Sequence, residues 1–192
     1  MAEEAAQQAP LTINSQYVKD HSFENPHAPG IYGKMREESP QLNINVEVTP
    51  THLQGSLYEV ALRLEASAKI GEISAFQIDL HYAAVVTLAD SLEEAVREQM
   101  LMIEVPRFLF PFARAILADD TRDGGFPPLI MNPIDFHQMY VSRKMAAAGG
   151  QAGTPGDSQG QAQSGEADTA APAEGDGGDA SAEENTAANR QA

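Results

Sequence analysis

Apolar and polar residues alternate along much of the first half of the chain. In three segments the apolar side chains fall on every second position, with polar side chains between them. A period of two is typical of a β-strand with one covered face and one solvated face. Together with a fourth strand-like segment near the N-terminus, the pattern predicts a four-stranded antiparallel sheet. The predicted strands are residues 12–24, 42–48, 58–69 and 76–82.

The first of these strands has an acidic side. Asp20, Ser22 and Glu24 recur at a period of two, so they share one face of the strand. The connection that follows, residues 25–40, is rich in proline and glycine and is longer than a hairpin needs. This length predicts a crossover connection.

A helical pattern follows the strands. Ser91 and Glu94 match a capping box, in which the serine side chain accepts from the backbone and the glutamate reaches back to the serine. An apolar stripe with a helical period continues to Ile103. Pro106 predicts the end of this helix, because a proline disfavours helical geometry at the preceding residue.

A second helix, at about residues 107–121, is unusually rich in phenylalanine. Gly124 and Gly125 predict where it ends. A helix that is apolar nearly all round must be covered on several sides, so we expect contacts between subunits. One predicted face consists of Leu109, Phe112, Ala113, Ile116 and Leu117, while Phe108 and Phe110 cover much of the rest.

A last helix is predicted from Asn132, which would cap it, with Pro133 in the first position. Phe136, Met139 and Tyr140 would share one of its faces. Strands followed by helices indicate an α+β fold, with the helices packed on one face of the sheet.

The end of the chain has a composition typical of disorder. Residues 146–192 contain no Leu, Ile, Val, Phe, Met or Tyr, and cannot bury enough apolar surface to offset the entropy of ordering. We expect a disordered acidic Ala/Gly-rich tail at 146–192, a disordered N-terminus at 1–10 and one folded domain at 11–145. The chain carries a net charge of −16, and the part before the tail still carries −9. Such acidity favours basic partners and argues against nucleic acid.

Candidate chemistry is sparse. The chain has no cysteine, which excludes disulfides and Cys-ligated metals, and its five histidines lack close ligand spacing. A Gly-Ile-Tyr-Gly string at 30–33 matches the loop of KH nucleic-acid modules, but it conflicts with the acidity of the chain. We expect neither an enzyme nor a metal or other cofactor, and keep a hydrolase built on buried carboxylates and His81 as the weakest alternative. An acidic N-terminus and short apolar runs predict a cytoplasmic protein without a signal peptide or membrane insertion.

Several short motifs resemble the bacterial protein-export chaperone family SecB. They are Leu-Phe-Pro-Phe-Ala-Arg at 109–114, Gly-Phe-Pro-Pro-Leu at 125–129, Pro-Ile-Asp-Phe at 133–136, Tyr-Val-Lys-Asp-His-Ser-Phe-Glu at 17–24, Asn-Pro-His-Ala-Pro at 25–29, Tyr-Glu-Val-Ala-Leu-Arg at 58–63 and Ala-Phe at 75–76. The resemblance runs in order from about residue 11 to 142. It implies a homotetramer, a dimer of dimers, that holds unfolded precursor proteins without ATP and passes them to the translocation motor SecA.

The resemblance also implies two binding sites. The SecA-docking patch of the family lies on the exposed sheet face and corresponds here to Asp20, Glu24, Gln77 and Asp79. Its ligand is a basic, zinc-bearing C-terminal segment of SecA, so the zinc would belong to the partner. The client-binding groove is apolar, and its candidates here are Ile31, Tyr32, Leu42, Ile44, Val46, Phe108 and Phe112.

The same residues also have purely structural explanations. Asp20 and Glu24 would also fit a solvated strand edge, and the phenylalanines would also fit core or subunit contacts. A second function is a non-export adaptor or a toxin–antitoxin-associated chaperone of the same fold. Such a protein would use the acidic sheet without delivering precursors for export.

Overall fold

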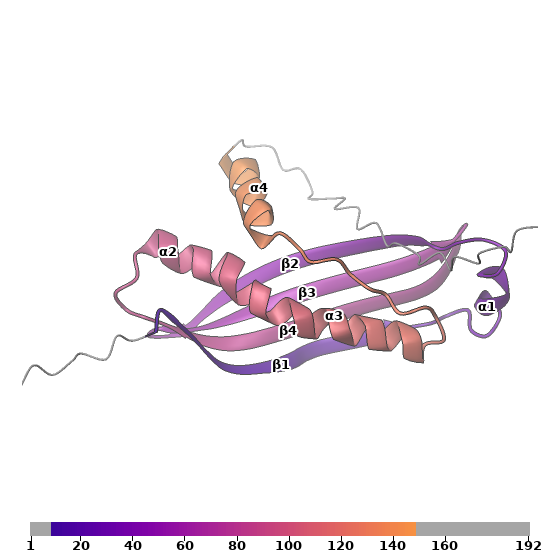
Figure 1. Cartoon of the computed structure of the whole chain (residues 1–192), viewed down its shortest axis with the longest axis horizontal. Coiled ribbons are helices and arrows are strands. Elements are labelled where there is room, and N and C mark those ends of the chain that lie inside the picture. Colours follow the sequence, from indigo (N-terminus) through magenta and orange to yellow (C-terminus); the bar gives the residue numbers. More distant parts are fainter. Residues whose placement is uncertain (1–8, 149–192) are drawn as a thin grey trace, which may run out of the picture. The chain divides into compact units, whose positions relative to one another are not determined.

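Four long antiparallel strands form the sheet in the computed structural model, which describes residues 9–148 (Figure 1). The strands are β1 (Leu11–Glu24), β2 (Gln41–Gln54), β3 (Leu57–Ile70) and β4 (Ile73–Leu88). Their order across the sheet is β1-β4-β3-β2, so β1 and β2 lie at opposite edges. The predicted crossover is therefore confirmed. It carries a short helix that the sequence pattern did not predict, α1 (Ile31–Lys34).

Two of the strands extend well beyond their predicted ends. β2 continues to Gln54 and β4 to Leu88, whereas the alternation had indicated ends at 48 and 82. The cause in β4 is apolar residues on both faces: Ala83 and Ala84 are both fully buried. A strand that is apolar on both sides loses the period-two signal, although its backbone pairing continues.

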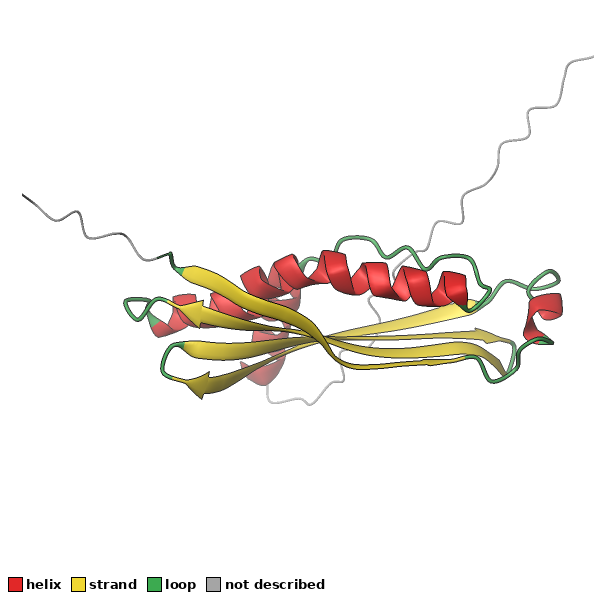
Figure 2. Cartoon of the chain, turned by 90° about the horizontal axis from the view of Figure 1, so that it is seen from below, coloured by secondary structure: helices red, strands yellow, loops and turns green. Residues whose placement is uncertain are grey.

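Helices lie against one side of the sheet (Figure 2). α2 (Glu94–Gln99), the π-helical turn η1 (Met100–Glu104) and α3 (Val105–Asp123) follow one another without a break. The predicted helix end before Pro106 is therefore wrong. Pro106 lies in the first turn of α3 and follows a π turn, where the hydrogen-bond pattern is already interrupted, so its missing N–H is accommodated.

The capping box is also wrong. α2 begins at Glu94 with Glu93 as the N-cap, and no side-chain capping bond forms there. Instead of starting a helix, the segment after β4 makes a turn in which the Leu92 backbone N–H donates to the Ala89 carbonyl (3.2 Å). Tertiary placement of the β4–α2 connection overrides the local capping signal.

The predicted end of α3 is confirmed. The helix stops at Asp123, and Gly125 has a φ of +82°, a left-handed conformation that favours glycine. The last helix, α4 (Phe136–Ala148), begins later than predicted. Asp135 caps it instead of Asn132, because its Oδ1 accepts the Gln138 backbone N–H at 2.9 Å.

The core lies between α3 and the inner strands. Along β3, side chains at even positions from Val60 to Ala68 are at most 1% exposed, and Leu109, Ala113 and Leu117 of α3 are fully buried. Phe112 is 52% exposed although the pattern placed it on the buried stripe, whereas Phe110 is 5% exposed and packs on Phe136. The spacing of Leu109, Ala113 and Leu117 decides which side of α3 meets the sheet.

Most of the tail prediction, residues 149–192, lies outside the described residues, as do residues 1–8. Residues 146–148, which were assigned to the tail, form the end of α4. Across residues 9–148, the helices are too short or too polar to cross a membrane.

Candidate functional site

The four residues of the predicted docking patch share one face of two neighbouring strands. In the antiparallel register of β1 and β4, Asp20 lies opposite His81, Ser22 opposite Asp79, and Glu24 opposite Gln77. A register shift between Val18 and Asp20 precedes this stretch. We call the sheet face opposite α3 the outer face. In its central part it carries Asp20, Ser22 and Glu24 of β1, Gln77, Asp79 and His81 of β4, Arg63, Glu65 and Ser67 of β3, and Asn43, Asn45 and Glu47 of β2.

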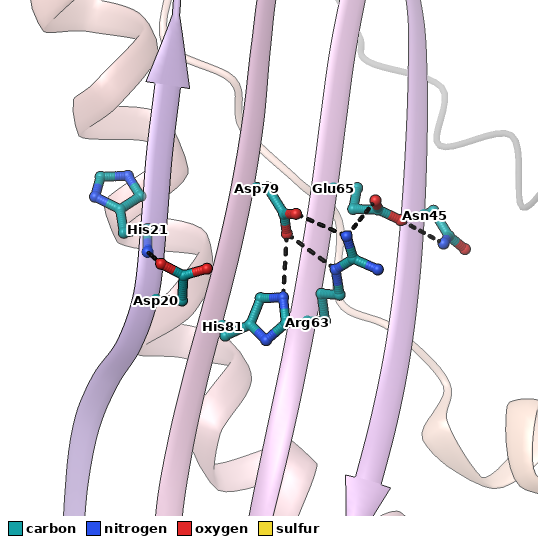
Figure 3. Close-up of polar contacts among 7 residues, drawn as sticks. All are labelled: Asp20, His21, Asn45, Arg63, Glu65, Asp79 and His81. Carbon is teal, nitrogen blue, oxygen red and sulfur yellow. Dashed lines mark hydrogen bonds and ion pairs between the residues drawn. The ribbon is translucent and has the colours of Figure 1, made fainter.

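Asp79 is held by a cation from the adjacent strand. Arg63 of β3 donates to it through two bonds, Nε to Oδ1 at 3.0 Å and Nη2 to Oδ2 at 2.7 Å (Figure 3). The hydrogen bonds from Arg63 lower the pKa of Asp79 and outweigh the opposing effect of desolvation. His81 Nε2 lies 3.4 Å from the same carboxylate. Asp79 is thus ionised, and the charge of Arg63 compensates its negative charge.

Asp20 and Glu24 are in a different electrostatic state. Both are exposed, and neither forms a salt bridge with any of residues 9–148. The Asp20 carboxylate accepts the backbone N–H of His21 at 3.0 Å, which orients it without neutralising it (Figure 3). These two carboxylates are available to an incoming cation, as is Glu47 of β2, which is also exposed and forms no salt bridge with the described residues.

Another compensated carboxylate lies further along the outer face. Glu59 of β3 accepts a hydrogen bond from the Tyr17 hydroxyl and pairs with Lys19 Nζ at 2.5 Å. The hydrogen bond from Lys19 is the largest of the effects that lower the pKa of Glu59, whereas the bond to Glu59 raises the pKa of Tyr17 to about 12. Both Tyr17 and Glu59 therefore keep their usual charge at neutral pH.

Two small hollows open on the outer face. One of about 170 Å³ is lined by Asn43, Asn45, Glu65, Ala66, Ser67, Gln77 and Ile78. Another of about 230 Å³ is lined by Lys19, Glu47, Thr49, Thr51, Glu59, Ala61, Arg63 and His81. Both are below the range of roughly 300–1,000 Å³ typical of small-molecule pockets. The geometry suits a polypeptide laid across the strands better than an enclosed small ligand.

Apolar side chains are exposed on the helix side of the molecule. Phe108 and Phe112 of α3 are each 52% exposed, and Val18 of β1 is 47% exposed. Phe112 stacks on Tyr82 of β4, with ring centroids 6.2 Å apart, and Tyr82 is paired with Val18 across the sheet. An apolar surface therefore continues from α3 onto the β1 edge of the sheet.

The other predicted groove residues lie elsewhere in the protomer. Leu42, Ile44 and Val46 are on β2, at the opposite edge of the sheet from β1; Leu42 is 37% exposed and the other two are partly buried. Ile31 is only 1% exposed, so its side chain is not accessible to a bound chain in this structure. Tyr32 packs on Phe126. One protomer does not bring the seven residues together into one groove.

Sequence reasoning missed Arg63 and Tyr82. Arg63 is sixteen positions from Asp79, and only the register of β3 against β4 makes them neighbours. Tyr82 ended the alternating stretch and gave no sign that it would support an exposed phenylalanine. The sequence pattern placed Arg63 and Asp79 on the polar faces of their strands, but it did not show that they form a pair.

Comparison with known proteins is consistent with this fold. The sequence model of the SecB family, described as preprotein translocase subunit SecB, matches residues 4–147. The protein-export protein SecB of Rhodospirillum rubrum is 48% identical over 142 residues, covering 74% of this chain and 87% of that protein. The same-named protein of Parvibaculum lavamentivorans is 44% identical over 137 residues, covering 71% and 80%.

A solved structure shares the fold at low identity. It is the SecB-like chaperone of Mycobacterium tuberculosis in complex with a peptide from the HigA1 antitoxin, with a TM-score of 0.56 and 15% identity, covering 66% of this chain and 91% of that one. The family consists of chaperones and not of enzymes, in agreement with the expectation from the sequence. The family match and the identity to export proteins lead to one conclusion: the chain belongs to the SecB family of protein-export chaperones.

Proposed function

We propose that this export chaperone holds unfolded precursor proteins in the cytoplasm without ATP and delivers them to SecA through the outer face. The docking residues are Asp20, Glu24, Gln77 and Asp79, and the ligand is the basic, zinc-bearing C-terminal segment of SecA. The observation that carries the proposal is the register of β1 against β4, which gathers these four positions on one exposed face. Uncompensated carboxylates at Asp20 and Glu24 would attract a basic segment, with a strong dependence on salt.

The holding activity is proposed for the apolar surfaces on the helix side. An unfolded client exposes many apolar groups and a folded one few, so binding selects the unfolded state by mass action and needs no nucleotide. Each fully buried client side chain would contribute about 1.5–3 kcal/mol, and a micromolar affinity needs about 8 kcal/mol in total. The exposed phenylalanines Phe108 and Phe112, together with Leu42, Ile44 and Val46, are the candidate contacts.

The proposed assembly is a homotetramer built as a dimer of dimers. Its support is the exposure of large apolar side chains on α3 and β1, since a monomer rarely leaves such a surface uncovered. Assembly would also place groove residues of different protomers near one another, which a single protomer does not do. Native mass spectrometry with and without a denatured client would measure subunit number and loading together.

Charge reversal tests the docking site. In the double variant Asp20→Lys/Glu24→Lys, we expect binding of the SecA segment, followed by fluorescence anisotropy at low salt, to weaken more than tenfold. Suppression of aggregation of a denatured precursor should stay unchanged, because the helix side is untouched. Asp90→Lys/Glu94→Lys alters two exposed acids outside the outer face by the same charge and should bind normally.

Two outcomes would contradict this proposal. If Asp20→Lys/Glu24→Lys binds the SecA segment as tightly as wild type, the proposed docking site is wrong. A wild-type protein that binds the segment but does not suppress aggregation would instead be an adaptor that does not handle unfolded chains.

A further inference from the structure

Arg63 occupies the centre of the acidic part of the outer face. It lies opposite His81 of β4 on one side and opposite Glu47 of β2 on the other. The carboxylates around this position come from three strands, and Arg63 is the one guanidinium in the central part of the outer face. A basic partner approaching the face would therefore meet a cation that the protein already holds there.

The guanidinium engages two carboxylates at once. Its two bonds to Asp79 form the fork geometry that is stronger and more directional than a single ion pair. The same Nη2 lies 2.8 Å from Glu65 Oε1, and Glu65 Oε2 accepts a bond from the Asn45 side chain at 2.8 Å (Figure 3). These contacts form a continuous network that runs from β4 through β3 to β2.

The network divides the carboxylates of the face into two sets. Asp79 and Glu65 are paired with Arg63, whereas Asp20, Glu24 and Glu47 form no salt bridge with any described residue. Glu47 lies opposite Arg63, while Asp20 and Glu24 lie on the edge strand β1, away from this cation. The side chain of Arg63 is 35% exposed and that of Asp79 29%, so an external lysine or arginine can reach the pair. Its cation could take the place of Arg63 only by breaking two hydrogen bonds.

We propose that Arg63 is an internal competitor of the basic partner: by occupying Asp79 and Glu65 it weakens docking and concentrates recognition on Asp20 and Glu24. This inference rests on the proposed docking function and names the residue that sets its strength. An exposed ion pair contributes little to the stability of the fold. The main consequence of Arg63 is therefore a lower affinity for cations, which keeps docking reversible.

Removal of the guanidinium tests the inference. We expect Arg63→Gln to bind the SecA segment at least threefold more tightly than wild type at low ionic strength, with the gain shrinking at high salt. A short oligolysine peptide serves as a second probe. It should show the same gain in affinity if the outer face recognises only the positive charge of the segment. In Arg63→Gln/Asp79→Asn, which restores the net charge of the wild type, the affinity should return to within twofold of wild type.

Matched controls separate local competition from net charge. Arg122→Gln removes one cation from α3, and should leave the affinity within twofold of wild type. Arg63→Lys keeps the charge without the two-bond fork and should lie between wild type and Arg63→Gln. Arg63→Met retains the apolar stem of the side chain and should show the same gain in affinity. It replaces Arg63→Gln if circular dichroism shows that the glutamine variant folds poorly.

Unchanged or weaker binding by folded Arg63→Gln and Arg63→Met would overturn the competitor role, as would an equal gain in Arg122→Gln. These outcomes differ from a failure of docking itself. If wild type does not bind the SecA segment, or if Asp20→Lys/Glu24→Lys binds normally, the proposed site is wrong whatever the arginine variants do.

Discussion

The two faces of the sheet use the same strands in opposite ways. On β3, Leu62 and Leu64 are fully buried beneath the helices, while Arg63 and Glu65 between them lie in the ionic network of the outer face. The helix-side face is stabilised by contacts within the protomer. The outer face keeps three carboxylates, those of Asp20, Glu24 and Glu47, free of salt bridges among the described residues. The comparison teaches that a buried stabilising contact and an exposed ionic group can be separated by one residue along a strand.

The separation has an exception at one edge. Phe112 and Tyr82 stack on the helix side, yet Phe112 is half exposed. The exposed apolar surface is thus part of the face that otherwise forms the core. This is the region where we propose that other subunits or clients complete the packing.

The largest expected effect on stability comes from removing apolar volume from the buried face of the sheet. Leu64→Ala removes a fully buried side chain from β3 and should lower the free energy of unfolding by about 2–5 kcal/mol, because a cavity remains. Ser67→Ala, on the outer face of the same strand, should change it by less than about 0.5 kcal/mol. Urea denaturation of both variants measures the difference. Similar losses in the two variants would break the contrast between the faces.

An intermediate effect is expected at a buried polar group on the helix side. Thr121 is fully buried, and its Oγ1 accepts the Leu129 backbone N–H at 2.9 Å while donating to the Leu117 carbonyl. Thr121→Val keeps the shape but leaves the Leu129 N–H without its acceptor, so we expect a loss of about 1–3 kcal/mol. Thr121→Ser keeps the hydroxyl and should lose less. Thermal and urea unfolding test this, and equal stability of the valine variant and wild type would contradict it.

The smallest expected effect is the pH dependence of the ion pair on the outer face. Because Arg63 lowers the pKa of Asp79 below its ordinary value of 3.8, the ionised carboxylate stabilises the fold above that pH, and the contribution is lost as pH falls through the lowered pKa. Asp79→Asn should therefore be less stable than wild type at pH 7, by no more than about 1 kcal/mol. The gap should close in strong acid.

Ser22→Ala is the matched control for this measurement, since Ser22 lies opposite Asp79 and carries no charge. Its difference from wild type should be independent of pH. A gap between Asp79→Asn and wild type that persists or widens in acid would mean that the pair with Arg63 does not stabilise the fold.

Local patterns predicted the element types well and their limits less well. The alternation at Leu62, Arg63 and Leu64 identifies a strand, because side chains of a strand point to alternate faces whatever lies around them. The predictions from Ser91 and Pro106 were wrong for different reasons. A capping residue needs a particular backbone geometry, which Ser91 does not have in the fold. A π turn can accommodate a proline in a helix that continues, as it does before Pro106. Such features depend on how the segment is held by the rest of the fold.

The sequence by itself determined the α+β class, the crossover, and the family through its motifs. It also determined that Asp20 and Glu24 share one face of their strand. Only the tertiary structure decided that Arg63 meets Asp79 and that Phe112, not Phe110, is exposed. Periodicity is a property of neighbouring residues, so it can be read from the chain. Strand register and the side of a helix that faces a sheet arise from contacts between distant residues, and they exist only once the chain has folded.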